Sequence, residues 1–187
     1  LAALAGALFT NYLSSKISKL TLFKIAALIS VVAHCVLYFF SGEQLALAFV
    51  VFAIANFFHM VLVPLMFSMV PDTSDYGQMK FGKNTMGMAF SAHLLAIKLG
   101  LAIGAAATGW ILSGTGYVAN AVQSPEALAG IRLCFAGIPA LIGFILFWLM
   151  TFYKLDDETM DGIHASIASG VVINDLDAVG ELPASRI

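Results

Sequence analysis

The sequence contains few charged side chains, since only 11% of its 187 residues are Asp, Glu, Lys or Arg. A soluble domain carries about 25% charged and about 45 to 50% apolar residues. Here 60% of the residues are hydrophobic and the mean hydropathy is +0.94. This composition excludes an ordinary soluble domain and predicts an integral membrane protein.

The chain also has few cysteines and no surplus of basic residues. Its two cysteines, Cys35 and Cys134, stand singly inside apolar segments, which is typical of small buried side chains. We therefore expect no disulfide framework, no metal site and no cofactor. The formal net charge of -2 and the absence of a Lys/Arg cluster argue against nucleic acid as a partner.

The apolar residues form long runs. A helix needs about 20 apolar residues to cross the hydrocarbon core of a bilayer. The first run, residues 1–13, is too short to cross, and we expect it to be the end of a helix and the chain to be a fragment. We predict an all-α transmembrane bundle over residues 1–153. Four runs are long enough to span: residues 20–40, 44–70, 85–113 and 128–153.

Positive residues near helix ends predict the orientation. They cluster at one side of the predicted spans, and we expect this side, with the C-terminus, to be cytoplasmic. Residues 154–187 then form a cytoplasmic tail, in which 156–169 have the spacing of a short amphipathic helix and 171–187 have a loop-like composition. The lysines on this side are Lys16, Lys19, Lys24, Lys80, Lys83 and Lys154.

Lys98 stands near the middle of a long apolar segment. At ~1.5 Å per residue it lies roughly 20 Å from the start of a helix roughly 42 Å long, close to the bilayer midplane. A charge there costs several kcal/mol unless it meets water, a partner or a substrate, so by default it marks a functional pathway. The alternative is an ion pair with a carboxylate on a neighbouring helix.

The helix that carries Lys98 has two different faces. Gly100 and Gly104 form a GxxxG pair on the side where His93 also projects, and we expect another helix to pack there. The other face is a strip of small and polar side chains that is suited to a cavity or a polar ligand. The strip contains Asn84, Gly87, Ser91, Lys98, Ala102, Ala105 and Gly109.

Asn56 and His59 lie three residues apart on the preceding span and share a helical face. They are candidates for hydrogen bonds to a sugar hydroxyl, and hydrogen bonding between helices is an equally good explanation. Pro64 in the same span is expected to kink it, which membrane helices tolerate.

Residues 71–84 form a second candidate site, which we predict to be a cytoplasmic loop. Its charges are suited to ion pairs that close one side of a transporter and break when it opens. A solvated loop whose lysines only set the topology is the alternative. The candidate residues are Asp72, Asp75, Tyr76, Lys80 and Lys83.

These residues resemble a known family. The order Asp72-x-x-Asp75-Tyr76-Gly77, followed by Lys80, Gly82-Lys83 and the helix with Lys98, is similar to the C-terminal half of the glycoside-pentoside-hexuronide:cation symporter family. The resemblance extends from the segment of Lys16 and Lys19 to Tyr153. Gln78 stands where that family usually has an acidic residue.

The resemblance implies a major facilitator superfamily fold of twelve helices, of which this chain would carry the end of helix 8 and helices 9 to 12. It implies symport of a sugar or glycoside with Na+ or H+ by alternating access in the plasma (inner) membrane, among membrane lipid. Lys98 would match the family's lysine near the sugar and cation region. Asp72, Asp75 and Tyr76 would match the inner gate, and the cation ligands would come mainly from the missing N-terminal half.

Two other classes of function compete with a transporter. A non-transporting scaffold or receptor module would not need the midspan Lys98 and its polar strip. A membrane-embedded enzyme would need catalytic groups, and the sequence shows neither a Ser/His/Asp order nor a carboxylate pair inside its spans. We therefore expect a secondary transporter rather than an enzyme.

Overall fold

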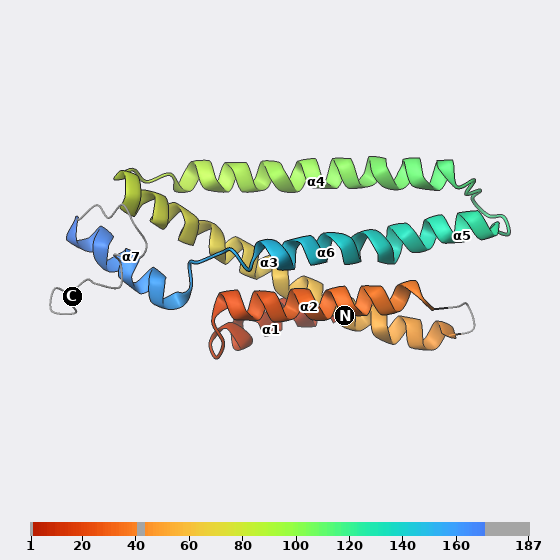
Figure 1. Cartoon of the computed structure of the whole chain (residues 1–187), viewed down its shortest axis with the longest axis horizontal. Helices are drawn as coiled ribbons and strands as arrows, with labels where there is room; N and C mark the ends of the chain where they lie inside the picture. The colour runs from red at the N-terminus through yellow and green to blue at the C-terminus, as the bar shows by residue number, and fades with distance from the viewer. Residues whose placement is uncertain (1, 41–43, 171–187) are drawn as a thin grey trace.

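The computed structural model describes residues 2–40 and 44–170, and this part of the chain folds into helices without strands (Figure 1). Residues 171–187 of the predicted tail lie outside the described part. The helices are α1 (Ala2–Ser14), α2 (Lys19–Tyr38), α3 (Leu45–Phe81), α4 (Met86–Gly114), α5 (Pro125–Arg132), a π-helical turn (Leu133–Gly137), α6 (Ile138–Leu149) and α7 (Asp157–Ser169).

Within residues 2–40 and 44–170, four helical stretches are long and apolar enough to cross a membrane: α2, α3, α4 and the continuous stretch Pro125–Leu149. They coincide with the four runs that the sequence predicts, apart from their ends. The last stretch begins earlier than residue 128 because Ser124 accepts a hydrogen bond from the Ala127 backbone N–H and Pro125 occupies the first turn. The prediction of an all-α membrane protein is confirmed.

One boundary is wrong in the sequence prediction. Residues 71–84 do not form a loop, because α3 continues through Pro71 and ends only at Phe81. Pro71 removes one backbone hydrogen bond without ending the helix, as membrane helices tolerate. Gly82 ends the helix instead, in a left-handed conformation with φ of 66° that favours glycine. A short link then leads to α4.

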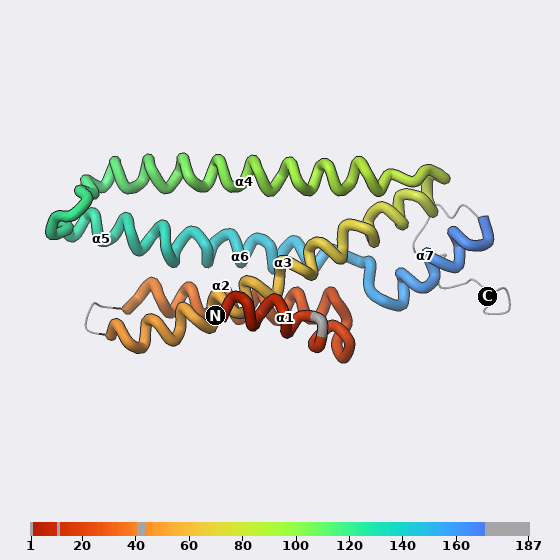
Figure 2. Tube along the Cα trace, turned by 180° about the vertical axis from the view of Figure 1, so that it is seen from behind, coloured from red at the N-terminus to blue at the C-terminus, as the bar shows by residue number. Residues whose placement is uncertain are grey.

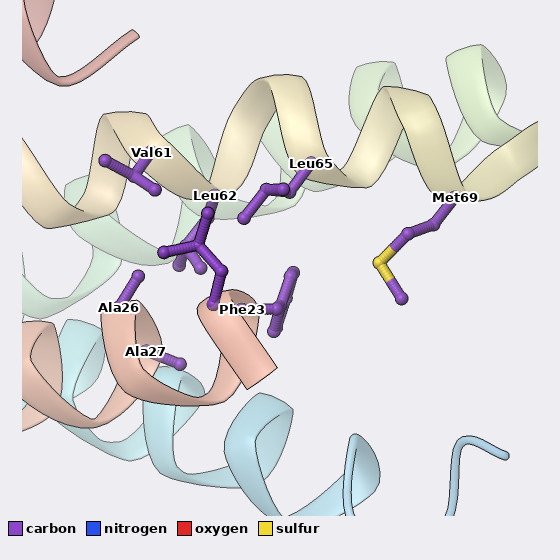
Figure 3. Packing of buried hydrophobic residues seen from close by; sticks show 8 residues of the cluster. Phe23, Ala26, Ala27, Val61, Leu62, Leu65 and Met69 are labelled. Atoms are coloured by element: carbon purple, nitrogen blue, oxygen red, sulfur yellow. The ribbon is translucent and has the colours of Figure 1, made fainter. Parts of the chain in front are cut away.

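The core lies between α2 and α3. Phe23 and Leu65 are almost fully buried, and the small side chains of Ala26 and Ala27 let the two helices approach closely (Figure 3). In the same way α1 approaches α3 at Gly6, where an added Cβ would clash with the backbone carbonyl of Phe57. Tertiary packing therefore holds α1, α2 and α3 together, and α6 packs on α2.

Two helices extend away from this core. The helix α4 runs along the length of the molecule, and none of its residues is buried by the described part of the chain (Figures 1 and 2). The short helix α7 lies against the far end of α3. We call the end of the molecule where Lys19, Asp72 and α7 lie the charged end.

Candidate functional site

An ion pair joins the beginning of α2 to the charged end of α3. The Lys19 Nζ lies 3.0 Å from Oδ2 and 3.2 Å from Oδ1 of Asp72, so one ammonium contacts both carboxylate oxygens. Ser18 caps α2 by accepting a hydrogen bond from the Thr21 backbone N–H, which places Lys19 at the first helical position. The Asp72 side chain is 10% exposed and that of Lys19 is 37% exposed. Burial on one side protects this pair from water.

A second carboxylate lies one helical turn further along α3. The Asp75 Oδ2 is 3.2 Å from the Nε2 of His164, which belongs to α7. This pair is more exposed, because 57% of the His164 side chain and 22% of the Asp75 side chain are accessible. The two predicted gate carboxylates therefore connect α3 to two other helices.

The predicted gate lysines do not pair with these carboxylates. The Lys80 Nζ donates to the Tyr76 hydroxyl at 3.4 Å and lies 5.7 Å from the centre of the Tyr76 ring, one turn away on the same helix. Lys83 is exposed, and it makes no ion pair or hydrogen bond within the described residues. Of the five predicted gate residues, Asp72 and Asp75 are the ones that join separate elements.

Two hydroxyl groups near this end are buried without a hydrogen-bond partner in the described structure. They belong to Ser74, which stands between Asp72 and Asp75 in the sequence, and to Tyr153, which packs against the core between α2 and α3. A buried polar group without a partner costs about 1–3 kcal/mol. The burial of these two hydroxyl groups is therefore unfavourable in this arrangement of the charged end.

The predicted cavity residues on α4 are exposed. Lys98 makes no ion pair or hydrogen bond within the described residues, and the Ser91 hydroxyl donates to the Gly87 carbonyl oxygen of its own helix at 2.8 Å. The strip is therefore accessible along a helix that has no neighbour on this face in the described part of the chain. Its role in a cavity stays a prediction.

Asn56 and His59 do not join Lys98 in a common site. The Asn56 side chain donates to the Phe52 carbonyl oxygen of its own helix at 3.1 Å. His59 lines a cavity of about 290 Å³ between α2, α3 and α6, together with Ser30 and His34. Asn56, Ser91 and Lys98 are not among the residues that line this cavity. Sequence reasoning overlooked His34, although Ser30 stands four residues before it on the same helical face.

The predicted packing face of α4 meets α3 at His93, whose ring centre lies 4.8 Å from that of Phe67. Nothing lies within 4 Å of a Cβ placed at Gly100 or Gly104 within the described residues. Their role in helix packing stays a prediction. The close backbone contact at Gly6 was not predicted, since a lone glycine in a short apolar run carries no spacing signal.

Sequence reasoning also overlooked both partners of the predicted gate carboxylates. Lys19 is 53 residues from Asp72, and His164 is 89 residues from Asp75. A usable signal existed for Lys19, because the positive residues that set the orientation mark the same side as the acidic segment. His164 stands beside Ile163 in the predicted amphipathic helix, at the edge of its apolar face.

The helix that carries His164 begins at a defined cap. The Asp156 carboxylate accepts a hydrogen bond from the Thr159 backbone N–H at 3.0 Å. Hydrogen bonds from the Thr159 side chain, and then from its backbone, hold the pKa of the Asp156 carboxyl below its ordinary value. Asp156 is therefore ionised at neutral pH and stabilises the first turn of α7.

The chain is similar in sequence to several known proteins. It is 33% identical over 169 residues to an uncharacterized 29.9 kDa protein of Pseudescherichia vulneris, covering 90% of this chain and 62% of that protein. It is 30% identical to a putative glycoside/cation symporter of Escherichia coli (strain K12), covering 89% of this chain and 36% of that protein. A glucuronide carrier protein homolog of the same organism is 33% identical, covering 82% of this chain and 34% of that protein.

The chain thus spans between about a third and two thirds of the length of these relatives. No solved structure matches it. The model of the MFS/sugar transport protein family matches residues 1–157, which include α1 to α6, Lys98 and both predicted gate carboxylates. This match confirms the family resemblance that the segment from Asp72 to Lys98 predicts. The chain belongs to the MFS/sugar transport protein family.

Proposed function

We propose that the protein containing this chain is a secondary active transporter that moves a sugar or glycoside together with a cation by alternating access. The observation that carries the proposal is the family match over residues 1–157. The names of two relatives refer to a glycoside/cation symporter and a glucuronide carrier. A small-molecule sugar or glycoside is therefore the substrate class that we assign.

The ion pairs at the charged end have the properties of a gate. An exposed ion pair is worth about 0–1 kcal/mol and we expect about 1 kcal/mol for the partly buried Lys19–Asp72 pair, so both pairs can break and form again at low cost. The Lys19–Asp72 pair joins α2 to α3, and the Asp75–His164 pair joins α3 to α7. We assign Asp72, Asp75, Tyr76, Lys80 and Lys83 to the inner gate, with the two carboxylates forming its contacts between helices.

We assign Lys98 to the central substrate and cation pathway. The helix α4 is long enough to span the bilayer, and Lys98 lies near its middle with an exposed side chain. A charge at that depth needs water, a partner or a substrate. Ser91 lies on the same face, and Asn56 and His59 of α3 are further candidates for sugar contacts, while Gly100 and Gly104 offer a packing face.

No Asp or Glu lies in residues 20–40, 44–70, 85–113 or 128–153. The coupling cation, Na+ or H+, would therefore be bound mainly by an N-terminal half of the same transporter. We place the protein in the plasma (inner) membrane as a multi-pass protein, with its charged end and C-terminus cytoplasmic because the lysines gather there.

Counterflow of labelled sugar by the complete protein in vesicles tests this function. Vesicles preloaded with unlabelled glycoside should take up labelled glycoside faster than empty vesicles, and a Na+ or pH gradient should drive net accumulation. A scaffold or receptor module would bind sugar at most, without counterflow, and an enzyme would change the labelled molecule chemically. The absence of counterflow with any glycoside, pentoside or hexuronide would contradict the proposal.

A further inference from the structure

The helix α7 is seated on the gate segment of α3 by an apolar contact. Met160 and Ile163 of α7 are buried against Met79 of α3, and Tyr76 packs at the edge of this cluster. Ile163 is fully buried and Met79 is 2% exposed, so the contact excludes water. Figure 2 shows α7 beside the end of α3 that carries the gate residues. The position of α7 therefore depends on the position of this end, and the reverse also holds.

The apolar contact is joined by one polar contact, between His164 of α7 and Asp75 of α3. At the distance of 3.2 Å between Nε2 and Oδ2, the imidazole can donate a hydrogen bond to Asp75 both as the neutral tautomer with its proton on Nε2 and as the charged imidazolium. When the imidazole is protonated, the same contact becomes an ion pair. Histidine is the side chain whose charge ordinarily changes between pH 5 and 8.

We propose that α7 is a strap on the inner gate, and that His164 makes the grip of this strap on α3 depend on the pH at the charged end. This inference rests on the proposed transport function, because it describes how one gate of that transporter is held. His164 acts as a positioning residue: it contacts Asp75 and holds the end of α3 in place.

The charges around His164 favour a tighter strap at lower pH. On α3 it faces Asp75, whose neighbour Asp72 is already paired with Lys19, and Lys80 lies next to Tyr76. On α7 itself Asp161 lies one turn before His164. The carboxylates of Asp75 and Asp161 attract an imidazolium at His164, whereas the ammonium of Lys80 is held at Tyr76. Protonation of His164 should therefore strengthen the contact, and deprotonation should weaken it.

Hydrogen exchange of the complete protein in lipid nanodiscs tests the strap without measuring transport. Protection factors, corrected for the intrinsic exchange rate at each pH, are compared at pH 5.5 and pH 7.8 for α7 and for residues 76–81. Because the pair is exposed, we expect protection of both segments to be about two- to fivefold higher at pH 5.5. A peptide from α2 serves as the internal reference.

Two variants identify the group responsible. His164→Gln retains a hydrogen-bond donor that cannot be charged, so the pH dependence should disappear while α7 stays seated. Asp75→Asn should remove the pH dependence in the same way. Glu158→Gln changes an exposed charge elsewhere on α7 and should leave the pH dependence intact. Protection that does not change with pH in the unmodified protein, or that still changes in His164→Gln, would overturn the strap.

Transport measurements connect the strap to the gate. Counterflow is measured at different pH values on the charged side. We expect the turnover rate of the unmodified protein to change about two- to fivefold over this pH range and that of His164→Gln to stay constant, with the KM for sugar nearly unchanged. A flat profile in the unmodified protein would overturn the coupling of the strap to the gate. If no sugar is transported while protection depends on pH through His164, the transport function fails and the strap itself stands.

Discussion

Lys98 and Asp72 are two charged residues in opposite situations. Asp72 is 10% exposed and paired with Lys19, whereas Lys98 is exposed and has no partner within the described part of the chain. A paired carboxylate that joins two helices contributes to structure. An unpaired ammonium near the middle of a membrane span is costly unless something else completes its surroundings. This difference determines what their substitution is expected to do.

The Lys98→Ala variant of the complete transporter should lose coupled accumulation of sugar while its expression and membrane insertion stay near normal. The reason is that removing a charge from midspan favours insertion, by up to a few kcal/mol, and removes only its interactions with substrate or cation. Accumulation in vesicles and yield in the membrane fraction check this.

A matched variant on the other face separates function from packing. Gly100→Leu should damage assembly, because a large side chain would force apart the helices that we expect to meet at Gly100 and Gly104. Normal accumulation by Lys98→Ala, or its failure through misfolding alone, would refute the functional assignment of Lys98.

The Asp72→Asn variant should weaken the closed inner gate and change turnover more than sugar affinity. A partly buried ion pair should be worth about 1 kcal/mol, so we expect a change of about fivefold in the turnover rate. Asp75→Asn should have a smaller effect, because its pair with His164 is more exposed. Counterflow rates and KM values of both variants check the order, and a double variant with Lys19→Met isolates the pair. Unchanged turnover in both variants would contradict the gate assignment and favour the alternative that charges in this segment only set the topology.

Individual residues also show what could be predicted from sequence. The spans, the amphipathic character of α7 and the acidic pair Asp72 and Asp75 follow from patterns that neighbouring residues create. Partners do not follow in this way: Lys19 and His164 meet these carboxylates only because α2 and α7, which are far from them in sequence, pack against α3. The surroundings of Lys98 likewise depend on tertiary contacts, which no periodicity in this sequence encodes.

At the scale of elements, α3 extends beyond its predicted end because packing against α7 outweighs the local signals for a loop. Pro71 and the acidic residues after it predict a loop, yet the backbone stays helical to Phe81 because α7 covers Met79 and its neighbours. The close contact of α1 with α3 at Gly6 was hidden for the opposite reason. A single glycine without a partner at helical spacing gives no pattern to interpret.

The Gly6→Leu variant should separate α1 from α3. An added Cβ already meets the backbone carbonyl of Phe57, which cannot move aside as a side chain would. Overpacking of this kind costs about 1–3 kcal/mol or more, so we expect a lower melting temperature of the protein purified in detergent. Gly87→Ala is the control, because nothing lies within 4 Å of that position in the described structure. Equal melting temperatures for both variants would contradict the close contact.

The Asp156→Ala variant should loosen the first turn of α7 by about 1 kcal/mol, the usual contribution of a helix N-cap. Since its pKa is lowered in the folded state, the stabilisation is complete above the ordinary aspartate pKa and is lost as the pH falls through the lower, folded value. The loss therefore lies below about pH 4, outside the range in which histidine titrates. Hydrogen exchange of the Thr159 and Met160 amides measures both effects.

Asp156→Asn provides the comparison for that measurement. Its amide oxygen still accepts the hydrogen bond from Thr159, but it does not titrate in this range. Protection of the first turn should therefore stay near that of the unmodified protein at pH 7 and should not fall on acidification. If Asp156→Asn loses protection in acid as the unmodified protein does, another group is responsible.

At the scale of the whole molecule, α4 presents a large apolar surface beside its polar strip within the described structure, with Leu94, Leu101, Ile103 and Trp110 exposed. A surface of this kind requires lipid or further protein around it. The chain also spans only part of the length of its relatives. The isolated polypeptide thus has a structured core and one helix without a protein partner on most of its surface.

A polypeptide of residues 1–187 alone should therefore not transport sugar. Alternating access requires two bundles that move around a central site, and the described helices form one packed group with α4 beside it. Vesicles that contain only this polypeptide should show no uptake above that of empty vesicles, whereas the complete protein should show counterflow. Sugar uptake by the isolated polypeptide would disprove the need for a second bundle.

The two prolines of α3 give this helix a preferred plane of bending. Pro64 and Pro71 are seven residues apart, close to two full turns, so both interrupt the backbone hydrogen bonds on the same side. Asp72 lies about 12 Å beyond Pro64, and a rotation of about 10° at that hinge would displace it by about 2 Å. That displacement exceeds what the 3.0 Å contact with Lys19 tolerates. A bend at Pro71 would move Asp72 little, because this residue is next to the hinge, and would swing the segment that contacts α7. The Lys19–Asp72 pair therefore responds mainly to the hinge at Pro64, whereas the Asp75–His164 pair responds to both hinges.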